Sequence, residues 1–421
     1  MLSRRRLLKG AAATGVLGAV SNFPLPAYAK TRPIKIGFVT PKTGPLAIFA
    51  EPDDFVLSQF RTALADGLEI NGAKHPVEFI VKDSQSNSNR ASSAAQELIF
   101  EDEVDIIAAS STPDTTNPVA DQAELNGVPC ITNDTPWQPH FFGRQGDPKV
   151  GFEYTYHFFW GLEDVIQVFM SLWDAVGTNK VVGAMWPNDP DGNGWSHPEL
   201  GFPPVMQQAG YKLVDPGRYQ NMTDDFSAQI SAFKEAGVEI ISGVMIPPDF
   251  TTFWTQAAQQ GFNPKVVNVA KASEFPQAMA ALGDRADGLS VEVWWHKYFP
   301  YMSSFNGQSC EALSDAYEAA TGKPWTMPLG AKHSLFEVVI DTLRRTQDLD
   351  SPESIAEAIR TTDLATVFGP VNFQTGPVPN ISKTPVAGGQ WQIEGGKPVL
   401  HIVTNSHTPS IGLTGAMKPI A

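Results

Sequence analysis

Short apolar runs, separated by segments with apolar residues at helical spacing, form the main pattern of the chain. The helical segments include 53–68 and 115–126. Strands are predicted at 34–39, 77–81, 104–109 and 128–132; the run at 104–109 does not alternate, which is typical of a strand covered on both faces. Strands that alternate with helices form parallel sheets, so this part of the chain is predicted to be a doubly wound α/β lobe.

The same alternation starts again further along the chain. Helical patterns cover 198–209, 226–236 and 249–260. Apolar runs that predict strands lie between and around them: 180–185, 211–214, 238–243 and 265–270. We therefore expect an α/β fold with two doubly wound parallel-sheet lobes.

Three segments are expected to cross between the lobes. Two of them read "GFEYTYHFFWG" (151–161) and "GLSVEVWWHKYFP" (288–300), and the third leads into the strand-rich tail. Helices near 309–320 and 332–346 need a lobe on which to pack. The expected division gives lobe 1 residues 30–155 plus 292–368 and lobe 2 residues 156–291 plus 369–421. Such a chain leaves a cleft between its lobes, where small ligands bind.

The first 29 residues are expected to be a twin-arginine-like signal peptide. They begin with "SRRRLLK", continue with an apolar region too short to span a bilayer, and end with Ala27-Tyr28-Ala29, which fits a cleavage site. The mature chain is then expected to start at Lys30 and to be exported to the periplasm.

Charge and motifs exclude several classes of function. The formal net charge is −15, and it becomes more negative without the basic signal, which argues against nucleic acid as a partner. No nucleophile–base set, phosphate-binding glycine motif or metal-ligand spacing is visible, so we expect no enzyme, no cofactor and no metal. The only cysteines are Cys130 and Cys310, and the sequence leaves open whether they pair.

The stretch "AASSTPDT" carries hydroxyl groups directly after the strand at 104–109. Ser110, Ser111 and Thr112 precede a helix, where such residues cap the first N–H groups. The same N–H groups and hydroxyls can bind an anion. Both interpretations stand at this point.

Several stretches together resemble a known family. They read "IKIGFVTPKTGPLA", "VDIIAASSTPDTTNPVADQAELNGVPCIT", "DFSAQISAFKEAGVEII" and "PPDFTTFWTQAAQQGF". In this order they are similar to the type I periplasmic binding proteins, specifically the leucine/isoleucine/valine-binding family of ABC-transporter solute receptors. The resemblance runs from about residue 34 to residue 395. It implies two hinged lobes that close on one small molecule and deliver it to an ABC permease in the inner membrane.

The resemblance also implies roles for individual residues. Ser110, Ser111 and Thr112 would hold a ligand carboxylate, and the residues after the next strand would border it: Asn133, Asp134 and Thr135. Amino-acid-binding members hold the ligand ammonium with an acidic residue whose place falls here on Lys271. A lysine repels an ammonium and attracts a carboxylate or polar oxygen. Alternatively, Lys271 points to solvent and Glu274 takes the acidic role.

Large aromatic residues near the expected cleft indicate what kind of ligand body could accompany the carboxylate. Phe49, Trp137 and Trp160 are candidates to line it, although most such residues serve packing. We expect a small carboxylate ligand with an aromatic or bulky apolar part. Two alternatives remain: a branched-chain or other amino acid as the ligand, or a ligand sensor for a membrane signalling partner. We expect the protein to be a monomer.

Overall fold

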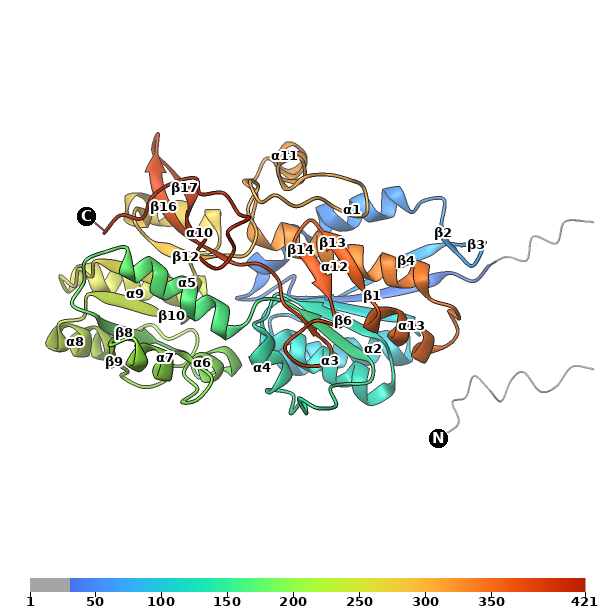
Figure 1. Ribbon diagram of the computed structural model, residues 1–421, viewed down its shortest axis with the longest axis horizontal. Coiled ribbons are helices and arrows are strands. Elements are labelled where there is room, and N and C mark those ends of the chain that lie inside the picture. Colours follow the sequence, from blue (N-terminus) through green and yellow to red (C-terminus); the bar gives the residue numbers. More distant parts are fainter. Residues whose placement is uncertain (1–30, 421) are drawn as a thin grey trace, which may run out of the picture.

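Two lobes lie side by side in the computed structural model, which describes residues 31–420 (Figure 1). The expected signal segment, 1–29, lies outside the described residues. The sheet of the first lobe has the order β15-β7-β6-β5-β1-β4, with all strands parallel. Its strands are β1 (Ile34–Thr40), β4 (Val77–Asp83), β5 (Ile106–Ser110), β6 (Cys130–Asn133), β7 (Thr155–Phe158) and β15 (Ile381–Ser382).

The second lobe contains a mixed sheet of order β17-β16-β12-β11-β10-β8-β9. Its parallel strands are β8 (Val181–Met185), β9 (Lys212–Val214), β10 (Ile240–Met245), β11 (Val266–Lys271) and β12 (Ser290–Val293). The antiparallel strands β16 (Ala387–Glu394) and β17 (Lys397–Thr404) extend one edge. The predicted α/β fold with two doubly wound lobes is confirmed.

Helices cover the faces of both sheets. The first lobe has η2 (Ala47–Ala50), α1 (Asp53–Ala63), α2 (Ser88–Phe100), α3 (Pro113–Asn126), α4 (Trp137–Phe141), α11 (Cys310–Thr321), α12 (Met327–Arg345) and α13 (Pro352–Arg360). The second has α5 (Leu162–Asp174), α6 (Pro190–Trp195), α7 (Phe202–Gln208), α8 (Ser227–Ala236), α9 (Pro247–Gln259), α10 (Pro276–Leu282) and η3 (Gly283–Ala286). Within residues 31–420, no helix has the length and apolar character needed to cross a membrane.

Some predicted elements differ from those observed. The helix expected over 53–68 ends at Ala63, and a hairpin of β2 (Leu68–Ile70) and β3 (Ala73–His75) follows it. Gly67 and Gly72 have φ values of +91° and +77°, a conformation that ends helices and forms tight turns. A second hairpin, β13 (Asp363–Thr366) with β14 (Gly369–Asn372), precedes β15.

The strands also locate the three crossings. Each strand is hydrogen-bonded within one sheet, so a lobe boundary inside a strand would divide that strand between two lobes. The expected boundary at 155/156 falls inside β7 and that at 291/292 inside β12, while β15 belongs to the first sheet. We therefore propose crossings after Phe158, after Val293 and after Ser382, instead of the boundaries expected from the sequence.

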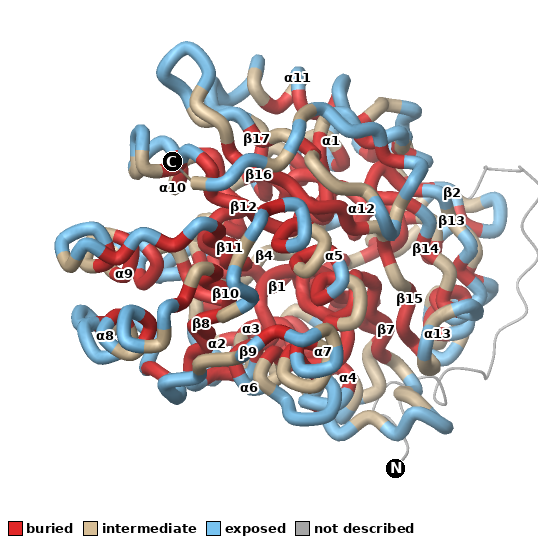
Figure 2. Tube along the Cα trace, turned by 60° about the vertical axis from the view of Figure 1, so that its left-hand side comes forward, coloured by how far each residue is buried: buried red, intermediate tan, exposed pale blue. Residues whose placement is uncertain are grey.

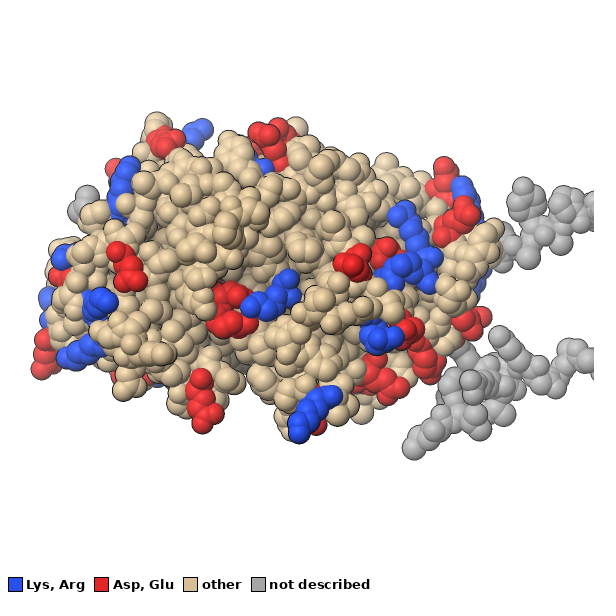
Figure 3. Space-filling model, in the orientation of Figure 1, with Lys and Arg blue, Asp and Glu red and all other residues tan. Residues whose placement is uncertain are grey.

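Buried strands form the centre of each lobe, as the red segments of Figure 2 show. Cys130 and Cys310 are both buried and both free, so they do not pair. On the face drawn in Figure 3, acidic and basic side chains are interspersed.

A stacked histidine pair lies in the interior of the first lobe. The rings of His140 and His157 are 4.1 Å apart, and both side chains are buried. His157 Nε2 donates to the carbonyl oxygen of Thr135 (2.7 Å), and its Nδ1 accepts from the hydroxyl of Thr132 (2.8 Å). Burial lowers the pKa of His157 to about 3 and also lowers the pKa of His140.

This pair is expected to make the protein less stable in acid. The unfolded histidine has a pKa near 6.5, so the unfolded chain binds protons first as the pH falls from 6.5 towards 3. Between pH 6.5 and 5 each such histidine removes about 2 kcal/mol from the free energy of unfolding. In urea unfolding, His157→Gln should show a smaller difference between pH 7 and pH 5 than the unsubstituted protein. The exposed His407→Gln should leave that difference unchanged, and an equal difference in all three proteins would contradict the prediction.

Candidate functional site

A small pocket of about 20 Å³ lies between the two lobes. The first lobe and its crossing contribute Phe49, Thr112, Asp134, Pro136, Phe159 and Trp160. The second lobe contributes Asp191, Trp195, Val244, Ala270, Lys271, Glu274, Glu292 and Trp294. Most of the polar lining residues stand at or just after the carboxyl ends of parallel strands, where ligands of open α/β sheets bind.

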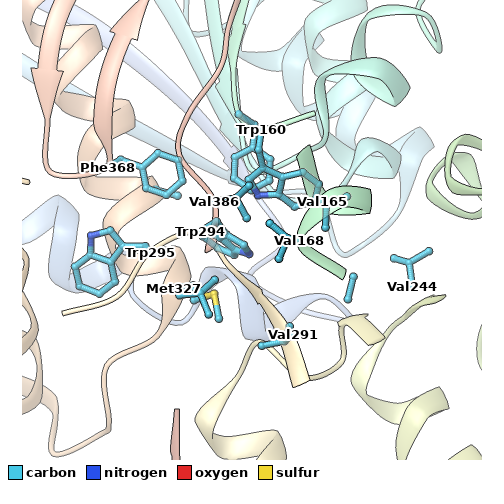
Figure 4. Packing of buried hydrophobic residues seen from close by; sticks show 14 of the residues in the cluster. Trp160, Val165, Val168, Val244, Val291, Trp294, Trp295, Met327, Phe368 and Val386 are labelled. Carbon is cyan, nitrogen blue, oxygen red and sulfur yellow. The ribbon is translucent and has the colours of Figure 1, made fainter. Parts of the chain in front are cut away.

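Aromatic rings make up much of the cavity wall. The ring of Phe159 lies 4.8 Å from that of Trp160 and 5.4 Å from that of Trp294. Figure 4 shows Trp160 and Trp294 close together among the buried apolar residues of this region. Trp195 stacks on Phe202, outside the cavity, at 5.0 Å. The indole N–H groups of Trp160 and Trp195 are buried and meet no acceptor in the described residues. Such a wall fits a flat or apolar ligand body with acceptor atoms at its edge.

Two polar residues of the first lobe face this wall. Thr112 is the N-cap of α3, yet its side chain makes no capping bond, and its buried hydroxyl has no partner among the described residues. Asp134 follows β6 with φ at +65°, and its Oδ2 also has no partner there. Burial raises the pKa of Asp134 well above its ordinary value. Buried polar groups without partners are uncommon in native proteins, so both residues are candidates for contact with a ligand.

Lys271 lies at the end of β11 and is buried, so the alternative in which it points to solvent is wrong. Its ammonium forms an ion pair with Asp191 of α6. Burial alone would lower the pKa of Lys271, but Asp191, Asp189 and Asp114 raise it above its ordinary value. Burial raises the pKa of Asp114 to about 7. The lysine charge is therefore already balanced inside the protein.

Two more acidic residues line the second-lobe side. Glu274, in the loop after β11, accepts a hydrogen bond from the backbone N–H of Lys271 (2.9 Å), while its Oε2 has no partner among the described residues. Glu292 projects from β12 and lines the same pocket, and both of its carboxyl oxygens are buried without a hydrogen-bond partner among the described residues. Burial raises the pKa of both carboxyl groups, and Glu274 raises that of Glu292 further.

The structure brings together half of the residues expected from the sequence. Phe49, Thr112, Asp134, Trp160 and Lys271 line the cavity. The other five are buried but not part of its lining: Ser110, Ser111, Asn133, Thr135 and Trp137.

Local contacts explain where three of these side chains lie, while the buried hydroxyls of Ser110 and Ser111, like that of Thr112, have no partner among the described residues. The hydroxyl of Thr135 donates to the carbonyl oxygen of Ser111 (3.0 Å). The amide of Asn133 donates to the carbonyl oxygen of Ala331 (2.9 Å), and the indole of Trp137 donates to Glu163 (3.1 Å). These residues hold the loops that carry Thr112 and Asp134, and a direct ligand contact by any of them stays a prediction.

A buried lysine of α12 binds the loop that leads to Thr112. Lys332 of α12 is fully buried, donates to the carbonyl oxygen of Ser110, and lies 3.8 Å from Asp53. Asp53 accepts from the hydroxyl of Thr40 (2.7 Å), and burial raises its pKa to about 6. This charge pair joins the ends of β1 and β5 to the start of α1.

Sequence reasoning missed several residues of the site. Asp191 and Trp195 lie in α6, within the stretch "NDPDGNGW" that follows β8, and the position of this stretch directly after a strand was the available signal. Glu292 is the one acidic residue in the apolar strand "SVEV", a pattern that indicates a buried functional carboxyl. Phe159 and Trp294 lie on the expected crossings.

The lobes are closed on each other outside the cavity. An apolar cluster joins Leu46 and Phe49 of the first lobe to Ile246 and Phe275 of the second. The rings of Phe49 and Phe275 meet edge to face at 4.9 Å. Phe49 takes part both in this contact and in the lining of the cavity. In residues 31–420, no group of histidine, cysteine or acidic side chains is arranged to hold a metal ion.

Comparisons with known proteins agree with this architecture. Residues 33–391 match the family model described as periplasmic binding protein, and the chain belongs to this family. It is thus a periplasmic solute-binding protein of the type I fold, a class that binds small molecules and works with an ABC permease.

Individual relatives are distant in sequence. The chain is 22% identical over 341 residues to the leucine-, isoleucine-, valine-, threonine- and alanine-binding protein of Pseudomonas aeruginosa, covering 81% of this chain and 85% of that protein. A leucine-binding protein of Thermotoga maritima superposes with a TM-score of 0.69 at 20% identity, covering 89% and 99% of the two chains. A Rhodopseudomonas palustris solute-binding protein in complex with 3,4-dihydroxybenzoic acid superposes with a TM-score of 0.70 at 18% identity, covering 87% of this chain and 94% of that protein.

Proposed function

We propose that the two lobes close on a small solute with an aromatic or bulky apolar body and a carboxylate, which the protein delivers to an ABC permease. The observation that carries the proposal is the pocket between the lobes, which has aromatic walls and is lined at the start of α3 by Thr112, whose buried hydroxyl has no partner among the described residues. A helix N-terminus with a free hydroxyl is suited to a carboxylate. The dihydroxybenzoic acid bound by the Rhodopseudomonas relative supports an aromatic acid.

An amino acid is the second candidate. Glu274 and Glu292 line the cavity opposite Thr112, and such carboxyl groups can receive an ammonium. The names of the Pseudomonas and Thermotoga relatives support this class. In both cases we expect a monomer that catalyses no reaction and is exported by the twin-arginine route. A ligand sensor for a membrane partner would use the same cavity.

Calorimetric titration with benzoate, dihydroxybenzoate, phenylalanine and leucine tests the proposal. At least one of these solutes should bind with one site per chain. Binding that is absent for all four, or that persists when Trp195 and Trp294 are replaced, would contradict the proposed site.

The hydroxyl of Thr112 is expected to contribute to affinity. Thr112→Val keeps the shape of the side chain but removes the hydroxyl, so the Kd of the tightest of these solutes should rise about tenfold. Thr251→Val, at an exposed position near the start of α9, is the matched control and should leave the Kd unchanged. An unaltered Kd in Thr112→Val would remove this residue from the site.

A further inference from the structure

Two tryptophan side chains in the wall of the pocket each have an indole N–H group without an acceptor. Trp160, just after β7, and Trp195, the last residue of α6, are 2% and 1% exposed, and both line the pocket. The Nε1 atom of each is buried and meets no acceptor among the described residues. An indole nitrogen can only donate a hydrogen bond, and leaving such a donor buried without an acceptor costs free energy.

Elsewhere the fold supplies acceptors to its buried indoles. Four of them donate to a carbonyl or carboxylate oxygen at 2.7 to 3.1 Å: Trp137 to Glu163, Trp254 to Arg285, Trp295 to Val367 and Trp391 to Ser273. Within residues 31–420 a third indole without an acceptor is that of Trp173 in α5, which packs on Tyr211 and does not line the pocket. Two of these three indoles therefore lie where a solute can supply the acceptor.

The other polar groups of the pocket favour an uncharged acceptor. Asp134, Asp191, Glu274 and Glu292 line the same space, and Asp191 balances the charge of Lys271. A second carboxylate on the solute would meet these acidic side chains, whereas a ketone or amide carbonyl adds no charge. A carbonyl oxygen has two lone pairs, so it can accept from one indole N–H or from two.

Resting on the proposed function, we infer that Trp160 and Trp195 are specificity-determining residues whose indole N–H groups bind an uncharged carbonyl oxygen on the body of the solute. A solute with this oxygen provides the acceptor that a purely hydrocarbon body lacks. A hydrocarbon body of the same shape therefore binds more weakly, although it packs equally well against the aromatic wall. The contact is separate from that of the solute carboxylate, which we place at Thr112.

Matched solutes that differ in one oxygen test this selection. The pairs are levulinate and isocaproate, p-acetylbenzoate and p-isopropylbenzoate, and γ-oxonorvaline and leucine. In each pair a ketone oxygen takes the place of a methyl group of similar size, and the last pair covers the amino-acid candidate. In at least one pair, calorimetry should give a Kd for the ketone member about tenfold lower than that for the methyl member.

Variants assign the preference to the two indoles. Trp160→Phe and Trp195→Phe keep an aromatic ring but remove the N–H group. Each should lower the ratio of the methyl member's Kd to the ketone member's Kd at least about threefold, while packing lost equally by both members leaves the ratio unchanged. Trp254→Phe, in α9 and outside the pocket lining, is the matched control and should keep the full ratio.

Nuclear magnetic resonance of the unsubstituted protein gives a second readout. With isotope-labelled tryptophan, the indole proton signals of Trp160 and Trp195 should move to lower field with the ketone member of the tightest pair and not with the methyl member. Because the two members have similar shapes, the difference reports a hydrogen bond and not packing. These signals decide the matter if a variant does not fold.

The outcomes separate the two proposals. Equal Kd values within every pair, or a ketone preference that survives both substitutions, would overturn the inference and leave the solute-binding site in place. Binding of no member of any pair would overturn the proposed ligand class together with the inference.

Discussion

Lys271→Met is expected to lower the free energy of unfolding by about 3–5 kcal/mol, because it leaves Asp191 as a buried anion without its cation. The side chains of this pair are 9% and 1% exposed, so water cannot replace the lost partner. Asp189 and Asp114, which act on the same lysine, add to the uncompensated negative charge. Urea unfolding monitored by circular dichroism measures the loss.

Two variants keep this prediction specific. Lys271→Met combined with Asp191→Asn removes both charges and should recover more than half of the loss. Lys42→Met breaks an exposed pair with Asp54 and should cost at most about 1 kcal/mol. If Lys271→Met and Lys42→Met lower the free energy of unfolding equally, the buried pair contributes no more to stability than the exposed one, and the prediction is wrong.

Lys332→Met is expected to have a similarly large effect in the first lobe. The change removes the cation that lies 3.8 Å from Asp53 and the donor to the carbonyl oxygen of Ser110, and all of these groups are buried. A loss of about 3–5 kcal/mol follows from the buried, unpaired carboxyl that remains. Because the lysine supports the strand end that precedes Thr112, solute affinity should fall as well.

The pH dependence of this variant provides a further check. Without Lys332 the pKa of Asp53 should rise above its value of about 6, so part of the loss should disappear as the pH is lowered towards 6 from above. Arg360→Met, in an exposed pair with Glu357 on α13, is the control and should cost at most about 1 kcal/mol. A Lys332→Met protein as stable as this control would contradict the assigned role.

The lobes could be predicted from the sequence because their central strands are unalternating apolar runs. β1, β5 and β10 each fall within two residues of the expected runs, since burial on both faces leaves this pattern in a strand. The end of α1 could not be predicted in the same way. Residues 64–75 contain apolar positions that also fit a helix, and the turn geometry at Gly67 and Gly72 decides for a hairpin.

The candidate site was only partly predictable for a different reason. Thr112 and Asp134 follow predicted strands, so their approach to the cleft follows from the parallel sheet. Glu292 and Trp294 are brought to the same cavity by the order of strands in the second sheet, which the sequence does not reveal. The pairing of Lys271 with Asp191 joins residues 80 positions apart, and it reverses the expectation that the lysine is free for a carboxylate.

A crystal structure of the protein with the tightest-binding solute tests the central claim most directly. We predict that the solute lies in the cavity between the lobes, with Thr112 on one side and Glu274 and Glu292 on the other, and its body against Trp294. A solute that lies elsewhere, or that contacts residues of one lobe alone, would contradict this account.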